Sequence, residues 1–165
     1  MEHDPYKMMK LTDQLCFPLY AASRSVVSLY APFLKPLGLT YTQYIVLLVL
    51  WEKDGIPVGE ICSRLMLDSG TLSPLLKKMQ QAGWIERNRS GADDRVVLIS
   101  LTEEGRALQE KAKDVPCRVG SCIGLPPEKA QMLYALLYEL LETQKNKAAD
   151  PAGNGRSDDQ KEITP

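Results

Sequence analysis

The stretch from Val58 to Leu101 reads VGEICSRLMLDSGTLSPLLKKMQQAGWIERNRSGADDRVVLISL, and the order of its patterns predicts the fold. A short helix is expected from Val58 to Leu65. The cluster at residues 67–71, LDSGT, is typical of the start of a second helix. That helix is expected to run to about Ala82 and to stop at Gly83, because glycine is common just past a helix end. Two short helices joined by a tight turn form a helix-turn-helix.

After Gly83 the spacing of apolar residues changes from helical to strand-like. Residues 84–89 (WIERNR) and 95–101 (RVVLISL) each indicate a strand, and the polar segment 90–94 (SGADD) indicates the turn between them. A helix-turn-helix followed at once by a polar-tipped hairpin is the plan of a winged helix. The sequence therefore predicts a mainly α fold with a small β-hairpin wing.

Helices are also expected on both sides of this module, at residues 12–35, 41–53, 103–113 and 127–145. Thr40 and Thr102 are in position to cap two of them, and residues 115–127 indicate an interrupted linker. The last helix carries a leucine stripe too apolar to face water on an isolated monomer. We therefore predict a helical dimerisation region at 1–36 and 114–147, a DNA-binding domain at 37–113 and a disordered tail at 148–165.

Length and composition restrict the class of protein further. The chain has 165 residues, enough for one ordinary domain, and is 44% hydrophobic and 25% charged, which is typical of a soluble globular protein. No apolar run reaches the roughly 18 residues that span a bilayer, and the N-terminus lacks the pattern of a secretory signal. We expect a cytoplasmic protein with no membrane contact. Because His3 is the single histidine, we expect no metal site, and no cofactor or catalytic residue is indicated.

The formal net charge of −1 does not by itself point to a nucleic-acid partner. The winged-helix plan does, because the second helix of such a unit enters the major groove of DNA. Small polar side chains at the start of that helix would meet bases, and basic side chains would meet phosphates. Asp93 or Asp94 is expected to pair with a wing arginine; a generic solvated surface is the alternative interpretation. The candidates for DNA contact are Ser69, Gly70, Thr71, Ser73, Lys77, Lys78, Arg87, Arg89, Asp93 and Arg95.

Cys16 is a candidate reactive thiol because it lies in the expected first turn of a helix. Pro18 fits that turn, where a missing N–H is harmless. The free N–H groups and positive dipole end there favour the thiolate, the form that attacks peroxides. A buried, inert cysteine is the alternative. For Cys62, which has apolar neighbours in a short helix, that structural interpretation is preferred.

Four segments together resemble a known family. They are QLCFPLYAASR (14–24), LGLTYTQYIVLLVLWEKDG (37–55), LDSGTLSPLLKKM (67–79) and DDRVVLISLTEEG (93–105). The last resembles the wing signature of the multiple-antibiotic-resistance regulator (MarR) family, and the set is similar to its organic-hydroperoxide-sensing, OhrR-like branch. The resemblance covers about residues 11–145. It implies a homodimer that binds operator DNA and represses transcription until an organic hydroperoxide oxidises a thiol.

The resemblance also implies roles for individual residues. The sensing thiol would be Cys16, with Tyr20, Tyr30 and Tyr41 hydrogen-bonding it. Tyr30 lies about 21 Å along the helix from Cys16, so only a partner's Tyr30 would reach that thiol. The resulting sulfenic acid would be resolved by Cys122, with Cys117 or a small thiol as alternatives.

Other function classes stay open at this stage. A winged-helix repressor that answers a phenolic or lipophilic ligand would make Cys16 incidental. A thiol peroxidase is less favoured, because the sequence has no cysteine–histidine arrangement or redox CxxC motif. A pure protein-interaction module would show no salt-sensitive binding to duplex DNA.

Overall fold

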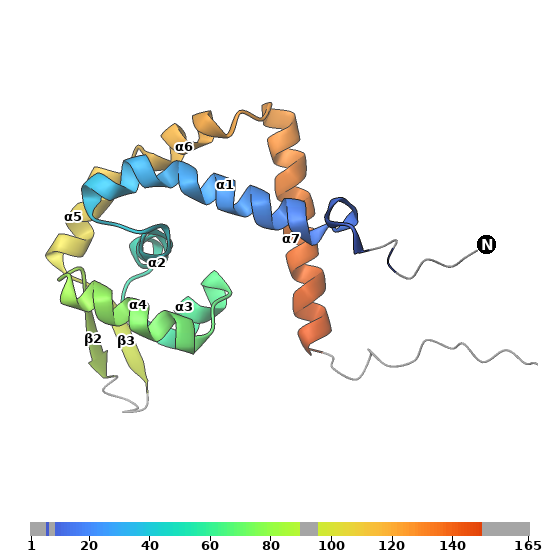
Figure 1. The fold of residues 1–165 in the computed structure, drawn as a ribbon. Helices are drawn as coiled ribbons and strands as arrows, with labels where there is room; N and C mark the ends of the chain where they lie inside the picture. The colour runs from blue at the N-terminus through green and yellow to red at the C-terminus, as the bar shows by residue number, and fades with distance from the viewer. Residues whose placement is uncertain (1–5, 7–8, 90–95, 150–165) are drawn as a thin grey trace, which may run out of the picture. The chain divides into compact units, whose positions relative to one another are not determined.

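The computed structural model describes residues 6, 9–89 and 96–149. The chain falls into two compact units, Met1–Ile123 and Gly124–Pro165. The first unit contains η2 (Leu11–Asp13), α1 (Cys16–Leu34), η3 (Lys35–Leu37), α2 (Tyr41–Glu52), β1 (Ile56–Pro57), α3 (Val58–Leu65), α4 (Ser69–Gln81), β2 (Ile85–Arg89), β3 (Val97–Leu101), α5 (Glu103–Ala112) and α6 (Val115–Ile123). The second contains α7 (Pro127–Ala149). Figure 1 shows these elements, and the winged-helix prediction is confirmed.

The centre of the first unit is α2, which Figure 1 shows end-on beside α1. Its start is fixed by a capping box, in which Thr40 and Gln43 each bind the other's backbone N–H. Apolar side chains on several sides of α2 are buried, so the helix packs against α1, α3 and α5. This confirms the predicted helix that begins after Thr40, and shows that it lies in the core.

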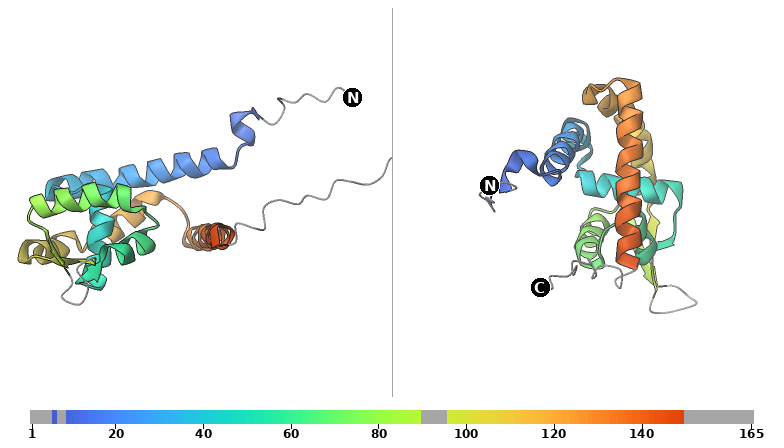
Figure 2. Two further views of the ribbon diagram at one scale, coloured as in Figure 1. Left: turned by 90° about the horizontal axis from the view of Figure 1, so that it is seen from below. Right: turned by 90° about the vertical axis from the view of Figure 1, so that its right-hand side faces the viewer.

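The sheet has three antiparallel strands in the order β1-β3-β2 rather than the two of the predicted hairpin. β2 and β3 pair from Ile85 opposite Leu101 to Arg89 opposite Val97, and Ile56 of β1 pairs with Ile99 on the other edge of β3. Strands β2 and β3 project together from the helices in Figure 1 and in the right-hand view of Figure 2. β1 therefore supports the middle of β3, next to the base of the wing, where Ile85 pairs with Leu101.

Hydrogen bonds at that base join the wing to α2 and α5. Asp54 accepts hydrogen bonds from the backbone N–H of Leu101 and from the Arg106 guanidinium. The Trp51 indole N–H donates to the Gly105 carbonyl at 3.0 Å, and the Thr102 N–H donates to the Trp84 carbonyl at 3.1 Å. These hydrogen bonds fix the ends of α2 and α5 to the base of the wing.

The prediction of an interrupted linker is wrong over Val115–Ile123, which forms α6. Val115 and Val119 are buried one turn apart on this helix, which packs against α1. The Arg118 guanidinium also lies 4.6 Å from the centroid of the Phe33 ring on α1. Pro116 does not prevent the helix because it occupies the first turn, where its missing N–H is not needed.

In the second unit, α7 continues past its predicted end near Lys145 to Ala149. Residues 148 and 149 of the predicted disordered tail are therefore helical, and the rest of that tail lies outside the described residues. Among the described residues, no single helix could cross a membrane; α1 with η3 and α2 meets the length and composition criteria only as a pair bent by 77°. Large exposed apolar side chains line α7: Met132, Leu133, Tyr134, Leu136, Leu137, Tyr138, Leu140 and Leu141.

Candidate functional site

The start of α4 is held by Asp68, a residue that the list of candidate DNA contacts did not include. One carboxylate oxygen accepts the Thr71 backbone N–H at 2.8 Å, and the other accepts the Thr71 hydroxyl at 2.6 Å. A Cβ on Gly70 would lie 3.0 Å from the same carboxylate, so the absence of a side chain there gives Asp68 room. The sequence signal was present, since aspartate directly before a helix is a preferred cap.

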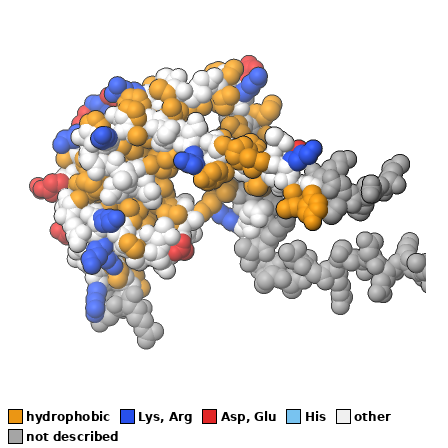
Figure 3. Space-filling model, viewed as in Figure 1, with side chains coloured by type: hydrophobic (Ala, Val, Ile, Leu, Met, Phe, Trp, Pro, Cys, Tyr) orange, Lys and Arg blue, Asp and Glu red, His pale blue; other side chains and the backbone are white. Residues whose placement is uncertain are grey.

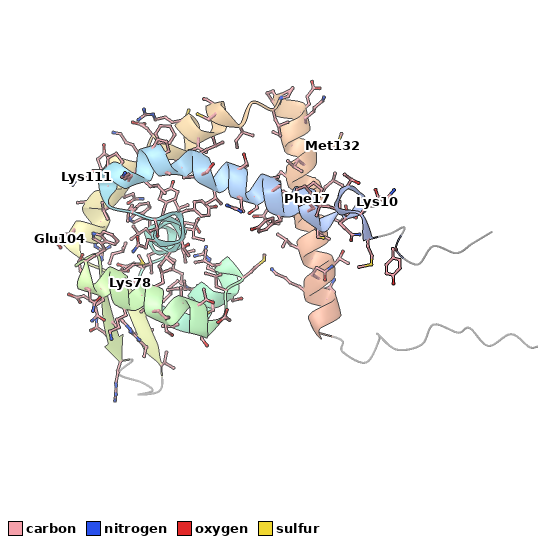
Figure 4. The ribbon with its side chains drawn as sticks, in the orientation of Figure 1. Lys10, Phe17, Lys78, Glu104, Lys111 and Met132 are labelled. Carbon is pink, nitrogen blue, oxygen red and sulfur yellow. The ribbon has the colours of Figure 1, made fainter. Side chains whose placement is uncertain are left out.

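The predicted base-contacting residues Ser69, Gly70, Thr71 and Ser73 are all exposed at the start of α4. Lys77 and Lys78 are exposed further along the helix, and Figure 4 shows Lys78 projecting from α4. The structure thus presents every α4 residue of the DNA prediction to solvent.

On the wing, Arg89 is exposed and Arg87 is half-buried, and β2, which carries both, contacts α4. Lys and Arg side chains gather over α4 and β2 at the lower left of Figure 3. The predicted DNA contacts Asp93 and Arg95 lie outside the described residues. The described part of the site is therefore an exposed basic face made by a helix-turn-helix and one strand of its wing.

The Asp68 cap predicts an acid-dependent loss of stability. Hydrogen bonds from the Thr71 hydroxyl and backbone N–H lower the pKa of Asp68 below its ordinary value of 3.8. A carboxylate with a lowered folded-state pKa stabilises the protein fully above its unfolded pKa and loses that contribution as pH falls through the folded pKa. In Asp68→Asn, an equally good cap that does not titrate, the urea midpoint should fall less steeply between about pH 5 and pH 2 than in the wild type. Identical pH profiles for the two proteins would contradict this.

Cys16 is the first residue of α1 and is exposed, and Pro18 lies in the same first turn. The predicted position of this thiol at a helix start is thus confirmed. The next turn carries Tyr20, whose side chain is 60% exposed and whose hydroxyl accepts a hydrogen bond from Arg24 at 3.3 Å. Phe17, labelled in Figure 4, lies beside Cys16 and is also exposed.

Tyr30 and Tyr41 form the second part of the predicted thiol site, at the other end of α1. Their ring centroids are 4.8 Å apart. Burial, and to a lesser degree the neighbouring Tyr30, raises the pKa of Tyr41 above 10.0, so its hydroxyl stays protonated and can donate a hydrogen bond. Both tyrosines line a pocket of about 530 Å³, together with Leu34, Lys35 and other residues. The structure therefore brings two of the three predicted tyrosines together and leaves Tyr20 apart, beside Cys16 in sequence.

Two aromatic residues that sequence reasoning did not single out extend this pair toward the wing. The Tyr44 ring lies 5.9 Å from that of Tyr30 and 6.2 Å from that of Trp51. Trp51 in turn donates its indole hydrogen bond to Gly105. The spacing of Tyr41, Tyr44 and Trp51 in the sequence indicates that they share one face of α2. It does not indicate that this aromatic series ends in a hydrogen bond to α5.

The other cysteines are also free thiols. Cys117 and Cys122 are exposed on α6, and Cys62 is partly buried against the core, as its apolar neighbours predicted. Seven residues complete almost two turns of a helix, so Cys122 lies on the same side of α6 as Val115, and Cys117 lies on another side. Among the described residues, no group of three His, Cys, Asp or Glu side chains could hold a metal ion.

The winged-helix fold and the exposed basic face on α4 and β2 together place this chain in the class of winged-helix DNA-binding proteins. The model of the transcriptional regulator SarA/Rot family matches residues 28–112. The organic hydroperoxide resistance transcriptional regulator of Bacillus subtilis (strain 168) is 51% identical over 143 residues, which cover 84% of this chain and 95% of that relative. This chain therefore belongs to the MarR family of winged-helix transcriptional regulators, in the organic-hydroperoxide-sensing branch.

Two solved structures of AbfR of Staphylococcus epidermidis are similar to this chain. Reduced AbfR bound to DNA is 37% identical with a TM-score of 0.69, and the match covers 84% of this chain and 96% of that one. Disulfide-formed AbfR is 38% identical with a TM-score of 0.57, and the match covers 82% and 95% of the two chains. The fold of this chain is thus found in one relative both with DNA and with a disulfide.

Proposed function

We propose that this chain is a cytoplasmic, homodimeric repressor that leaves its operator DNA when an organic hydroperoxide oxidises Cys16. The observation that carries the proposal is the exposed Cys16 thiol at the start of α1, in a chain whose α4 and β2 present a basic face. The similarity to an organic hydroperoxide resistance regulator of Bacillus supports the oxidant, and the DNA-bound and disulfide-formed structures of AbfR support DNA binding and a redox change.

The homodimer is supported by exposed apolar surface on both units. In the first unit, Leu15 and Phe17 flank Cys16 and are exposed, and in the second unit α7 carries its apolar stripe. Apolar surface of this extent is expected to be covered by a second copy of the chain, with each protomer offering the same surface.

A dimer would also complete the thiol site. Within one chain, most of the length of α1 separates Cys16 from Tyr30. Cys16 therefore does not reach the pocket that Tyr30 and Tyr41 line in its own protomer. We propose that Cys16 of one protomer binds beside Tyr30 and Tyr41 of the other. Their hydroxyls would donate hydrogen bonds that stabilise the thiolate.

The proposed chemistry has two steps. The Cys16 thiolate attacks the terminal oxygen of the hydroperoxide, the O–O bond breaks, a sulfenic acid forms, and the departing alkoxide takes a proton from water to become an alcohol. A second thiol then attacks the sulfenic sulfur, and a disulfide and water are formed. We propose Cys122 of the partner protomer as that thiol, because it is exposed at the end of α6, directly before the last helix, where the resemblance places the resolving cysteine; Cys117 and a small thiol are the alternatives.

The experiment that tests the function is a titration of operator DNA, selected from a random duplex pool, with reduced protein, oxidised protein and protein reduced again by dithiothreitol. The expected result is binding, about 5- to 150-fold weaker binding after cumene hydroperoxide, and recovery. An affinity for operator DNA that is the same before and after oxidation would contradict the proposal. A non-reducing gel should then show a covalent dimer that disappears in Cys122→Ser and persists in Cys117→Ser; the reverse would assign Cys117 as the resolving thiol.

The pocket beside Tyr30 and Tyr41 supports a second candidate, a repressor that answers a phenolic or lipophilic ligand. In that case, a bound phenol would weaken DNA binding in a variant that lacks Cys16. A thiol peroxidase would instead consume hydroperoxide continuously in the presence of a reductant. We propose a stoichiometric response, in which each Cys16 reacts once per reduction cycle.

Removing a basic side chain from α4 should weaken binding to every DNA sequence. In Lys78→Ala, the slope of log affinity against log salt concentration should become less steep by about 1.8, because the homodimer loses one phosphate contact in each protomer and each contact contributes about 0.9. Lys111→Ala is the matched control, because this lysine is exposed on α5, away from α4 in Figure 4. Equal slopes for the two variants would show that Lys78 contacts no phosphate.

A further inference from the structure

Two hydroxyl groups at the start of α4 already donate their hydrogens inside the protein. The Thr71 hydroxyl donates to the Asp68 carboxylate at 2.6 Å, and the Ser73 hydroxyl donates to the Ser69 carbonyl at 2.7 Å. Both side chains are exposed, on the helix that would enter the major groove. The contacts within the protein therefore decide whether these hydroxyls can donate a hydrogen bond to a base or only accept one.

The direction of the Thr71–Asp68 hydrogen bond follows from the state of the carboxylate. Its hydrogen bonds from Thr71 lower the pKa of Asp68, so the group is ionised at neutral pH and only accepts hydrogen bonds. The hydrogen between the two oxygens must then belong to Thr71. A hydroxyl has one hydrogen and two lone pairs, so the Thr71 oxygen has only lone pairs left for a ligand.

We propose that Thr71 is a specificity-determining residue of the operator complex, which accepts a hydrogen bond from the exocyclic amino group of adenine or cytosine. Adenine N6 and cytosine N4 are the hydrogen-bond donors that bases display in the major groove. Guanine O6 and thymine O4 would place lone pairs against the lone pairs of Thr71, so these bases are disfavoured at the contacted position. The inference rests on the proposed function, in which α4 reads DNA.

A single isosteric substitution should reverse this preference. In Asp68→Asn, the side-chain carbonyl still caps the Thr71 N–H, and the amide N–H₂ takes the place of the oxygen beside the Thr71 hydroxyl. The amide donates to Thr71, which releases the hydroxyl hydrogen toward the groove. Thr71 then acts as a donor, and guanine or thymine becomes the favoured base.

The test is selection of binding sites from a random duplex pool by reduced wild type, Asp68→Asn, Thr71→Val and Thr71→Ser. In the wild type, the base on the strand that Thr71 contacts should be adenine or cytosine, preferred over guanine or thymine on that same strand by about three- to tenfold, the size of one hydrogen bond. Asp68→Asn should prefer guanine or thymine there. Thr71→Val should show no preference at that position, and Thr71→Ser should behave as the wild type.

The outcomes separate this inference from the proposed function. A wild type that selects no sequence over random duplexes would overturn the proposed function and this inference with it. A wild type that selects an operator, while Asp68→Asn selects the same bases at every position, would overturn the inference alone. Thr71→Val that retains the full wild-type preference would overturn it as well.

Discussion

Replacing Cys16 by serine is expected to abolish the response to organic hydroperoxide and to leave DNA binding within about twofold of the wild type. The thiol is exposed and makes no contact that a hydroxyl of similar size would disturb in the core. A serine hydroxyl does not form the anion that attacks a peroxide near neutral pH, so no sulfenic acid forms. The affinity for the operator should then be the same before and after cumene hydroperoxide, where the wild type loses about 5- to 150-fold.

The matched control is Cys62→Ser, which changes a partly buried thiol of α3 in the same way. This variant should keep the full response, with a small loss of stability from placing a hydroxyl against the core. The measurement is fluorescence anisotropy of labelled operator, with thermal unfolding of each variant recorded beside it. If the Cys16→Ser protein still releases DNA on oxidation, another cysteine is the sensing thiol.

The starts of α2, α4 and α5 were predictable because their signals are local, whereas α1, which has no capping side chain, begins at Cys16 and not at the predicted residue 12. Thr40, Asp68 and Thr102 each stand one residue before a helix and each side chain caps it, as the structure shows. A cap depends on three or four consecutive residues, so one sequence carries all the information that it needs. The same holds for Gly83, which adopts a positive φ of 78° just after α4.

The missed elements depend on partners distant in sequence. β1 has only two residues, Ile56 and Pro57, and is a strand because Ile56 pairs with Ile99. The helix α6 contains Pro116 and Gly120, which weaken a local helix signal, and is held by burial of Val115 and Val119 beside α1. Propensity alone favours a loop there, and tertiary packing overrides it.

For the candidate site, the sequence indicated the residue types and the resemblance assigned their roles, but their grouping needed the fold. The spacing along α1 excluded contact between Cys16 and its own Tyr30, and the continuous helix from Cys16 to Leu34 agrees with that. The 4.8 Å separation of Tyr30 and Tyr41 depends on how α1 packs on α2, which periodicity does not specify. The packing of α2 on α5 connects Trp51 to the base of the wing in the same way.

Gly105 lies at that base, and Gly105→Ala is expected to cost about 3 kcal/mol or more of the free energy of unfolding. An added Cβ would lie 2.0 Å from the Trp84 carbonyl oxygen and 3.1 Å from a methyl carbon of Leu101. The carbonyl cannot move alone, because it accepts the Thr102 N–H at the junction of β3 and α5. Either α5 shifts from the wing or the strands separate, and each also disturbs the bond from Trp51 to the Gly105 carbonyl.

Gly120→Ala on α6 is the control. It tests whether the loss of stability comes from the crowding at position 105 or from any change of glycine to alanine in a helix. No atom lies within 4 Å of a Cβ added there, so alanine should stabilise the helix by about 0.5–1 kcal/mol. Urea unfolding of the two variants should therefore move in opposite directions from the wild type. Any Gly105→Ala protein that still folds should bind operator more weakly even when reduced, since β2 and α4 no longer hold one face. A urea midpoint of Gly105→Ala equal to that of the wild type would show that Gly105 does not lie in close contact with the Trp84 carbonyl.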